Sequence, residues 1–145
     1  MTGLANRNLA VYQSVAVEGG VANADPHALV QMLLDGIVER INTARACMEQ
    51  GERVRKAKLL HSCVTLVAEL RGSLDLTRGG ALARNLSDLY EYIATRLVLA
   101  NLQDDSALLA ESLSLIGEIR SAWIAIGPQV RATGPGAAVP AGTAE

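Results

Sequence analysis

The chain has 145 residues, of which 50% are hydrophobic and 19% charged, and its formal net charge at pH 7 is −2. This length allows one domain with a substantial core, and this composition is too apolar for a chain that is disordered throughout. The small net charge gives no general attraction to nucleic acid or to anionic lipid, so we expect neither as a partner.

No apolar run approaches the roughly 20 residues that a membrane-spanning helix requires. The N-terminus also lacks the basic start and apolar stretch of a secretory signal peptide. Cys47 and Cys63 stand within helical patterns and far from any C-x-x-C spacing, so we expect buried free thiols in a reducing compartment. These features predict a soluble protein of the cytoplasm.

Residues 1–24 carry only a weak pattern, with one short amphipathic stretch that Gly19-Gly20 would end. The apolar residues of this stretch are Leu9, Val11, Tyr12 and Val15. A helix of that length is marginal in water, so it must dock on another surface or fray. We therefore expect residues 1–24 to form an N-terminal docking segment.

A long helix is predicted between Asp25-Pro26 and Gly51. Asp25 can cap the first backbone N–H groups, and Pro26 suits the first helical position because it has no N–H to leave unpaired. Gly51 can take the left-handed conformation that ends a helix without steric cost. The apolar residues of this stretch recur at helical spacing: Val30, Leu33, Ile37, Ile41, Ala44 and Met48.

Three further helical patterns follow. The second begins near Glu52 and ends at residues 77–80, and the third runs from Gly79-Gly80 to Asn101. The fourth is capped by Asp104-Asp105-Ser106 and carries its last apolar residue at Ile126. The apolar stripes are Leu59, Cys63, Leu66, Leu70 and Leu74 on the second helix; Leu82, Leu86, Leu89, Ile93, Leu97 and Ala100 on the third; and Leu109, Leu113, Ile116, Ile119, Trp123 and Ile126 on the fourth.

Four such helices joined by short turns predict an all-α fold, an antiparallel four-helix bundle over residues 25–127. After Gly127 the composition changes to Ala, Gly, Pro, Val and Thr with isolated charges and no period. Such a segment cannot bury enough apolar surface to offset its ordering entropy. We therefore expect residues 128–145 to be a flexible, disordered tail.

Motifs that would carry catalysis are missing from the sequence. Neither His27 nor His61 has a glutamate three residues before it, so the di-iron motif of helical bundles is absent, as are H-E-x-x-H, G-x-S-x-G and the phosphate-binding loop. We expect no enzyme activity and no metal or other cofactor. The alternative is a helical-bundle ribonuclease of the HEPN type, in which Arg55 would hold the phosphate and His61 would move a proton.

Apolar residues are more numerous than one bundle seam can bury. Leu29, Met32 and Leu34 lie beside the stripe of the first helix, while Tyr90, Val98 and Leu99 lie beside that of the third. Stripes this wide favour an additional groove, which residues 1–24 can cover until a partner helix replaces them. Tyr90 and Tyr92 point about 100° apart on a helix, so at least one of them is expected at the boundary or on the surface.

The sequence resembles the flagellin-specific export chaperones of the FliS type from about Leu9 to Ile126. One departure is Leu34, where that family usually has tyrosine or phenylalanine before Asp-Gly. The shared marks are Tyr12-Gln13, residues 25–36 (DPHALVQMLLDG), Glu49-Gln50-Gly51, Gly79-Gly80, residues 85–93 (NLSDLYEYI), Arg96-Leu97, Ala100-Asn101 and Ala122-Trp123.

The resemblance implies a cytoplasmic bundle that binds the disordered C-terminal segment of flagellin, prevents its premature polymerisation and escorts it to the flagellar export apparatus. It also implies that the N-terminal segment, here Leu9 and Tyr12, covers part of the groove when cargo is absent. Further partners to consider are the cytoplasmic part of the export gate and an anti-sigma factor. Without cargo the chain is expected to be a monomer or a homodimer that pairs through the same apolar faces.

Our leading hypothesis is a binding module whose groove is lined by residues of the first and third helices. The residues that we expect to line it are Leu29, Met32, Leu33, Leu86, Leu89, Tyr90 and Ile93.

Overall fold

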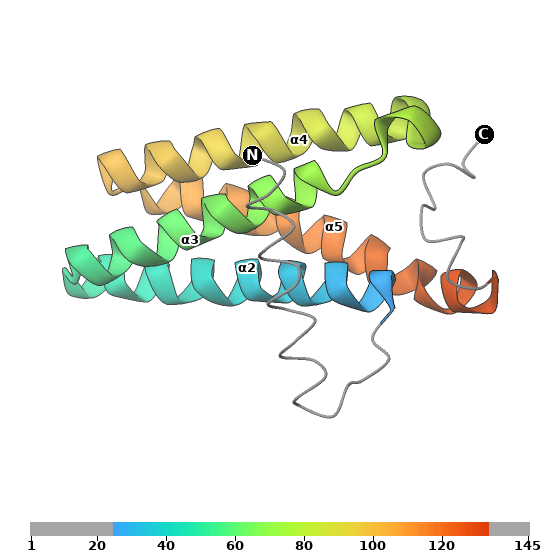
Figure 1. Cartoon of the computed structure of the whole chain (residues 1–145). Helices are drawn as coiled ribbons and strands as arrows, with labels where there is room; N and C mark the ends of the chain where they lie inside the picture. Colours follow the sequence, from blue (N-terminus) through green and yellow to red (C-terminus); the bar gives the residue numbers. More distant parts are fainter. Residues whose placement is uncertain (1–24, 134–145) are drawn as a thin grey trace.

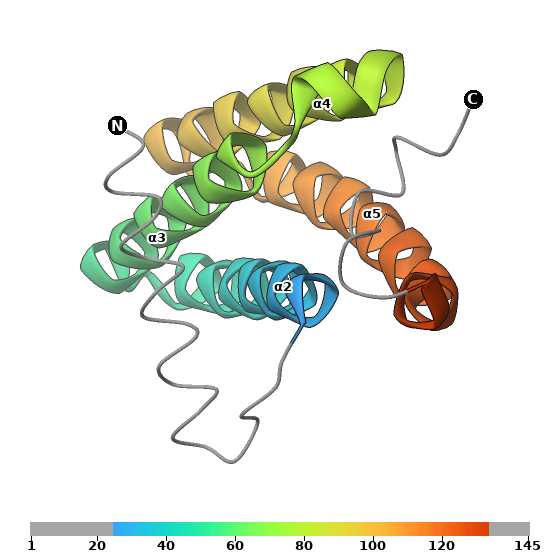
Figure 2. The same cartoon turned by 45° about the vertical axis from the view of Figure 1, so that its right-hand side comes forward.

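The computed structural model describes residues 25–133, with side chains as far as Pro128. Within this span the chain forms only helices, labelled here as in Figure 1: α2 (Pro26–Gln50), α3 (Arg53–Gly72), α4 (Leu76–Gln103) and α5 (Ser106–Thr133). Successive helices pack against each other and α5 packs back against α2, which closes a four-helix bundle (Figures 1 and 2). The predicted all-α bundle is confirmed, whereas the predicted docking helix within residues 1–24 lies outside the described residues.

The ends of α2 follow from its sequence. The Asp25 carboxylate accepts a hydrogen bond from the Ala28 N–H at 2.7 Å, and Pro26 occupies the first turn. Gly51 stands at φ 74° and so ends the helix in the left-handed conformation. At the start of α5, the Asp105 carboxylate accepts from the Ala107 N–H at 2.9 Å. The caps predicted at these two helix starts are therefore confirmed.

The boundary between α3 and α4 differs from the prediction. α3 ends at Gly72, and α4 already begins at Leu76, because the Asp75 carboxylate accepts a hydrogen bond from the Arg78 N–H at 2.9 Å and caps a new helix. Gly80, at φ 58° and ψ −138°, interrupts the regular geometry within α4. Gly80 therefore separates a short first segment from the long helix that follows it, as predicted, whereas α3 ends at Gly72 and not at residues 77–80 as predicted.

α5 also extends further than its apolar pattern. It continues through Pro128 to Thr133, so the boundary predicted after Gly127 is wrong. A proline removes only one backbone hydrogen-bond donor, and near the end of a helix that loss disturbs few neighbouring bonds. Residues 134–145, which make up the rest of the predicted tail, lie outside the described residues.

The core fills the space between the inward stripes of all four helices. Ile93, Leu97 and Ala100 of α4 have no exposed surface, whereas Leu82, at the start of the predicted stripe, is 42% exposed. The other core residues with no exposed surface are Leu33, Leu34, Ile37, Ile41, Ala44, Cys63, Leu109 and Ile116. Cys47 and Cys63 are buried free thiols, as predicted, and burial raises the pKa of Cys63 to about 12.

The two ends of the bundle are fastened by different contacts. At one end, the rings of His27 and Trp123 stack at 4.6 Å, and the Trp123 indole N–H donates to the His27 carbonyl oxygen at 2.8 Å. At the other end, the Lys56 ammonium is buried and donates to the Asn101 carbonyl oxygen at 3.0 Å and to the Asp104 carboxylate. These contacts connect α2 to α5 and α3 to α4.

Core packing predicts a large difference between two leucines of α4. Leu97→Ala removes a side chain with no exposed surface and is expected to lower the free energy of unfolding by about 2–5 kcal/mol. The same substitution at Leu102, which is 75% exposed, serves as the control and is expected to change it by no more than about 0.5 kcal/mol. Urea denaturation followed by circular dichroism measures both, and equal losses would contradict this assignment of the core.

Asp104 gives a prediction on pH dependence. Hydrogen bonding from Lys56, helped by the Lys56 and Arg53 charges, holds the pKa of the Asp104 carboxyl below its ordinary value. Because the folded state has the lower pKa, the stabilisation is present above the unfolded value of about 3.9 and is lost as the pH falls through the folded value.

Asp104→Asn tests this effect while keeping a residue that tolerates the φ of 50° at this position. The variant is expected to be less stable than the parent at pH 7, and the difference is expected to shrink as the pH falls below about 4. Urea titrations at several pH values measure it. A difference that stays constant down to pH 2 would contradict a role for the Lys56–Asp104 pair.

Candidate functional site

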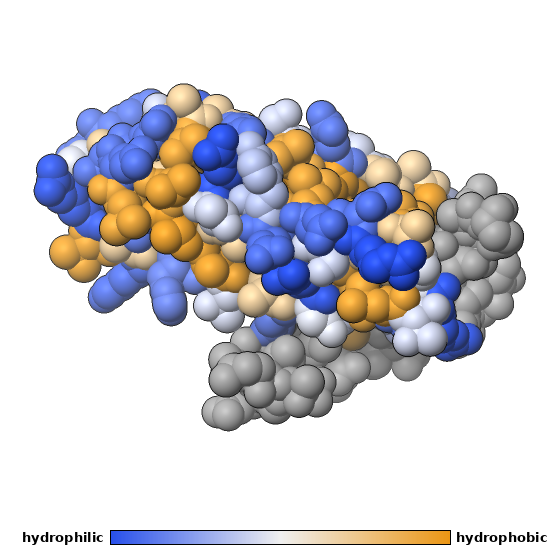
Figure 3. All heavy atoms as spheres, turned by 90° about the horizontal axis from the view of Figure 1, so that it is seen from above, coloured by the Kyte–Doolittle hydropathy of each residue, from blue (hydrophilic) through white to orange (hydrophobic). Residues whose placement is uncertain are grey.

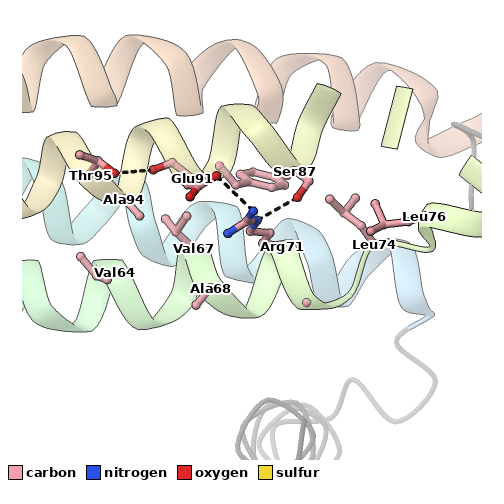
Figure 4. Close-up of a pocket in the computed structure, with 12 residues that line it drawn as sticks. Val64, Val67, Ala68, Arg71, Leu74, Leu76, Ser87, Glu91, Ala94 and Thr95 are labelled. Atoms are coloured by element: carbon pink, nitrogen blue, oxygen red, sulfur yellow. Dashed lines mark hydrogen bonds and ion pairs between the residues drawn. The ribbon is translucent and has the colours of Figure 1, made fainter. Parts of the chain in front are cut away.

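An open groove of about 590 Å³ lies between α3 and α4 (Figure 4). Val64, Val67 and Ala68 line it from α3, while Tyr90 and Ala94 line it from α4. These side chains are apolar or, in Tyr90, aromatic with 4% exposure. The groove therefore has an apolar floor and leads directly to the bundle core.

The connection between the two helices closes one end of the groove. Leu74 and Leu76 stand there, and Leu76 is 49% exposed. In Figure 4 both leucines lie at the same end of the groove, beyond Arg71. Because α4 begins at Leu76, the Leu76 side chain adds apolar surface to this end of the groove.

One polar bridge spans α3 and α4 across this groove. The Arg71 guanidinium donates from Nε to the Ser87 hydroxyl oxygen at 2.8 Å and from Nη2 to the Glu91 carboxylate at 3.2 Å (Figure 4). The Arg71 and Glu91 side chains are 42% and 62% exposed. A pair so exposed to water contributes little to stability.

Most of the residues that we expected to line a groove lie in the bundle core or pack against it. Leu33 and Ile93 have no exposed surface, Leu29 is 7% exposed, and Met32, Leu86 and Leu89 are half-buried. α2 and α4 each pack against α3 and α5, so they stand diagonally in the bundle and their facing stripes form the core. The lining by first- and third-helix residues therefore stays a prediction, and of these residues only Tyr90 lines the observed groove.

The groove residues that sequence reasoning missed are mostly small or polar. Ala68, Ala94 and Ser87 stand beside the core stripes and gave no apolar signal. A usable signal was the repeat of spacing four and then three at Val64, Ala68 and Arg71 and again at Ser87, Glu91 and Ala94. It marks matching faces on two adjacent antiparallel helices.

Apolar surface continues beyond the groove on α4. Val98 is 46% exposed and Leu102 is 75% exposed, and on α3 Val54 is 71% exposed. In Figure 3 the apolar atoms on the upper face are broken up by charged ones and gather most toward the left, where α4 ends. Tyr92 is 39% exposed, which confirms that one of the two neighbouring tyrosines lies at the surface.

Arg55 and His61, the residues of the alternative ribonuclease site, do not form a cluster. Both are exposed on α3, and the Arg55 guanidinium stands 3.6 Å from the Glu52 carboxylate, one turn earlier. Six residues along a helix turn the side-chain direction by about 240°, so the two point to different sides of α3. No helix of residues 25–133 is long and apolar enough to cross a lipid bilayer.

Comparison with known proteins finds similar sequences that cover most of the chain. The family model described as Flagellar protein FliS matches residues 8–130. The flagellar secretion chaperone FliSB of Pseudomonas aeruginosa is 43% identical over 112 residues, which cover 77% of this chain and 89% of that protein. The flagellar secretion chaperone FliS of Salmonella typhimurium is 39% identical over 119 residues, with 81% and 88% covered. FliS of Vibrio cholerae is 34% identical over 122 residues, with 84% and 90% covered.

A match over this length, together with a bundle that leaves an open groove between two helices, identifies the chain as a member of the FliS family of flagellar proteins.

Proposed function

We propose that this protein is a flagellar secretion chaperone that binds the C-terminal segment of flagellin in the groove between α3 and α4. The relatives support the first part, because each of them is a flagellar secretion chaperone. The open groove with its apolar floor is the observation that carries the second part. A groove of this kind suits the apolar face of a helix or the side chains of an extended segment.

The length of the groove fits a short element of a longer ligand. From Val64 to Gly72 α3 rises about 12 Å, which is a little more than two helical turns. A flagellin segment that is disordered when free must lose conformational entropy when it binds, so the net affinity is lower than the buried area suggests. Reversible binding of this kind is suitable for a chaperone that must release its cargo for export.

The function follows from covering the segment. While it lies in the groove, its apolar side chains are unavailable for polymerisation, and the complex can reach the cytoplasmic part of the export gate. Residues 1–24, with Leu9 and Tyr12, remain our proposed cover of the binding surface without cargo, and these residues lie outside the described part of the chain. An anti-sigma factor remains a proposed secondary partner.

This function requires no chemical step, and we propose that the chain is not an enzyme. The surface positions of Arg55 and His61, on different sides of α3, favour the binding module over the ribonuclease. Without cargo we propose a monomer or a homodimer.

Substitutions in the groove test the site. Ala68→Arg and Ala94→Arg each place a long charged side chain on the apolar floor and are expected to weaken binding of a flagellin C-terminal peptide by at least about tenfold. Fluorescence anisotropy with a labelled peptide measures the dissociation constant. Ala46→Arg on exposed α2 surface is the matched control and is expected to bind like the parent.

Circular dichroism checks that all three variants remain folded. Parental affinity in both groove variants would contradict the proposed site. A charged substitution at Tyr90 is unsuitable for this test, because that side chain is 4% exposed and its loss would damage the core.

The ribonuclease alternative is tested separately. We expect no RNA cleavage by the purified protein, and we expect His61→Ala to bind the flagellin peptide with parental affinity because His61 does not line the groove. Gel analysis of a labelled RNA and the same anisotropy assay measure the two properties. RNA cleavage that disappears in His61→Ala would favour the ribonuclease.

A further inference from the structure

The Arg71 bridge lies in the middle of the groove, with apolar lining on both sides. Toward one end stand Val64 and Ala94, and toward the other stand Leu74 and Leu76 (Figure 4). Any segment that fills the groove from end to end must therefore pass over the Arg71 guanidinium. The contacts that Arg71 then makes decide whether covering it is favourable.

Arg71 has hydrogen-bonding capacity to spare. A guanidinium carries five N–H donors, and Arg71 uses Nε for Ser87 and one donor of Nη2 for Glu91. Among the described residues nothing accepts a hydrogen bond from its Nη1. The Ser87 and Glu91 side chains thus hold the Arg71 guanidinium in place, while its remaining N–H donors stay available to a ligand.

The two charges of the bridge respond differently when the groove is covered. Arg71 is the less exposed partner, at 42%, and it stands against the apolar floor, so a ligand would remove much of its remaining water. Glu91 also lines the groove, but at 62% exposure it can keep more of its hydration than Arg71. A guanidinium that loses water needs an anion in compensation, because an uncompensated charge under a ligand is costly.

We propose that Arg71 determines the specificity of the groove by pairing with a carboxylate of the bound segment, an aspartate or glutamate flanked by apolar residues. This inference rests on the proposed function, since it names the chemistry of the same cargo. On binding, Arg71 keeps its contact with Ser87 and exchanges part of its contact with Glu91 for the carboxylate of the ligand. The apolar neighbours of that acidic residue fill the two halves of the groove.

A purely structural bridge would behave differently. If Arg71 served only to join α3 to α4, then removing either partner of the ion pair would disturb the groove in the same way. If Arg71 pairs with the ligand, then removing Arg71 weakens binding, whereas neutralising Glu91 releases Arg71 from a competing carboxylate. Arg71→Met and Glu91→Gln therefore distinguish the two roles, and both keep side chains of similar length.

The test is a double-mutant cycle with a synthetic flagellin C-terminal peptide and a set of its variants in which each Asp or Glu is replaced singly by Asn or Gln. We expect Arg71→Met to weaken binding of the parent peptide about tenfold, and Glu91→Gln to leave it equal or tighter. One acidic replacement in the peptide is expected to cause a similar loss with the parent protein and no further loss with Arg71→Met.

Each result assigns a role. Equal losses in Arg71→Met and Glu91→Gln, or the absence of any peptide carboxylate that couples to Arg71, would overturn the inference while leaving the groove as the binding site. Binding that is insensitive to Ala68→Arg and Ala94→Arg as well would instead overturn the proposed function itself. Circular dichroism of the two bridge variants confirms that each is folded.

Discussion

Each helix of a four-helix bundle can turn only one stripe of side chains inward, and this constraint governs the whole structure. On α4 that stripe is Ile93, Leu97 and Ala100, and on α2 it includes Ile37 and Ile41. α2 and α4 stand diagonally, so their stripes meet in the core and are fully used there. Apolar residues beside the stripes remain at the seams between adjacent helices. At the seam between α3 and α4 they line an open groove, and the proposed chaperone function depends on that surplus.

The polar groups at the seam add selectivity to this apolar surface. Burying apolar surface drives association without choosing among apolar partners, because the hydrophobic effect has no direction. The Arg71 guanidinium, held by Ser87 and Glu91 on the opposite helix, supplies a directed donor at a fixed place along the groove. A ligand with a carboxylate at the matching position satisfies it, whereas one without a carboxylate leaves it unpaired.

Much of the fold could be predicted from the sequence because its signals are local. Asp25 and Gly51 cap α2 through their own side-chain and backbone chemistry, and Cys63 follows the helical period into the core. The end of α3 was not predicted correctly, because Gly79-Gly80 is a strong stop signal and drew the predicted end past Asp75. Asp75 is the residue that caps the next helix. The groove could not be predicted either, because residues that line a groove recur along a helix with the same spacing of three and four as residues that face the core. Only the order of helices around the bundle shows that the stripes of α2 and α4, with Leu33 and Ile93, are both used in the core.

Methyl NMR of the protein with and without a flagellin C-terminal peptide tests the central claim most directly. The account predicts that the largest chemical-shift changes occur at Val64, Leu74 and Leu76, which line the groove between α3 and α4. Changes confined to Leu29 and Met32 on α2, with the groove methyls unaffected, would contradict it.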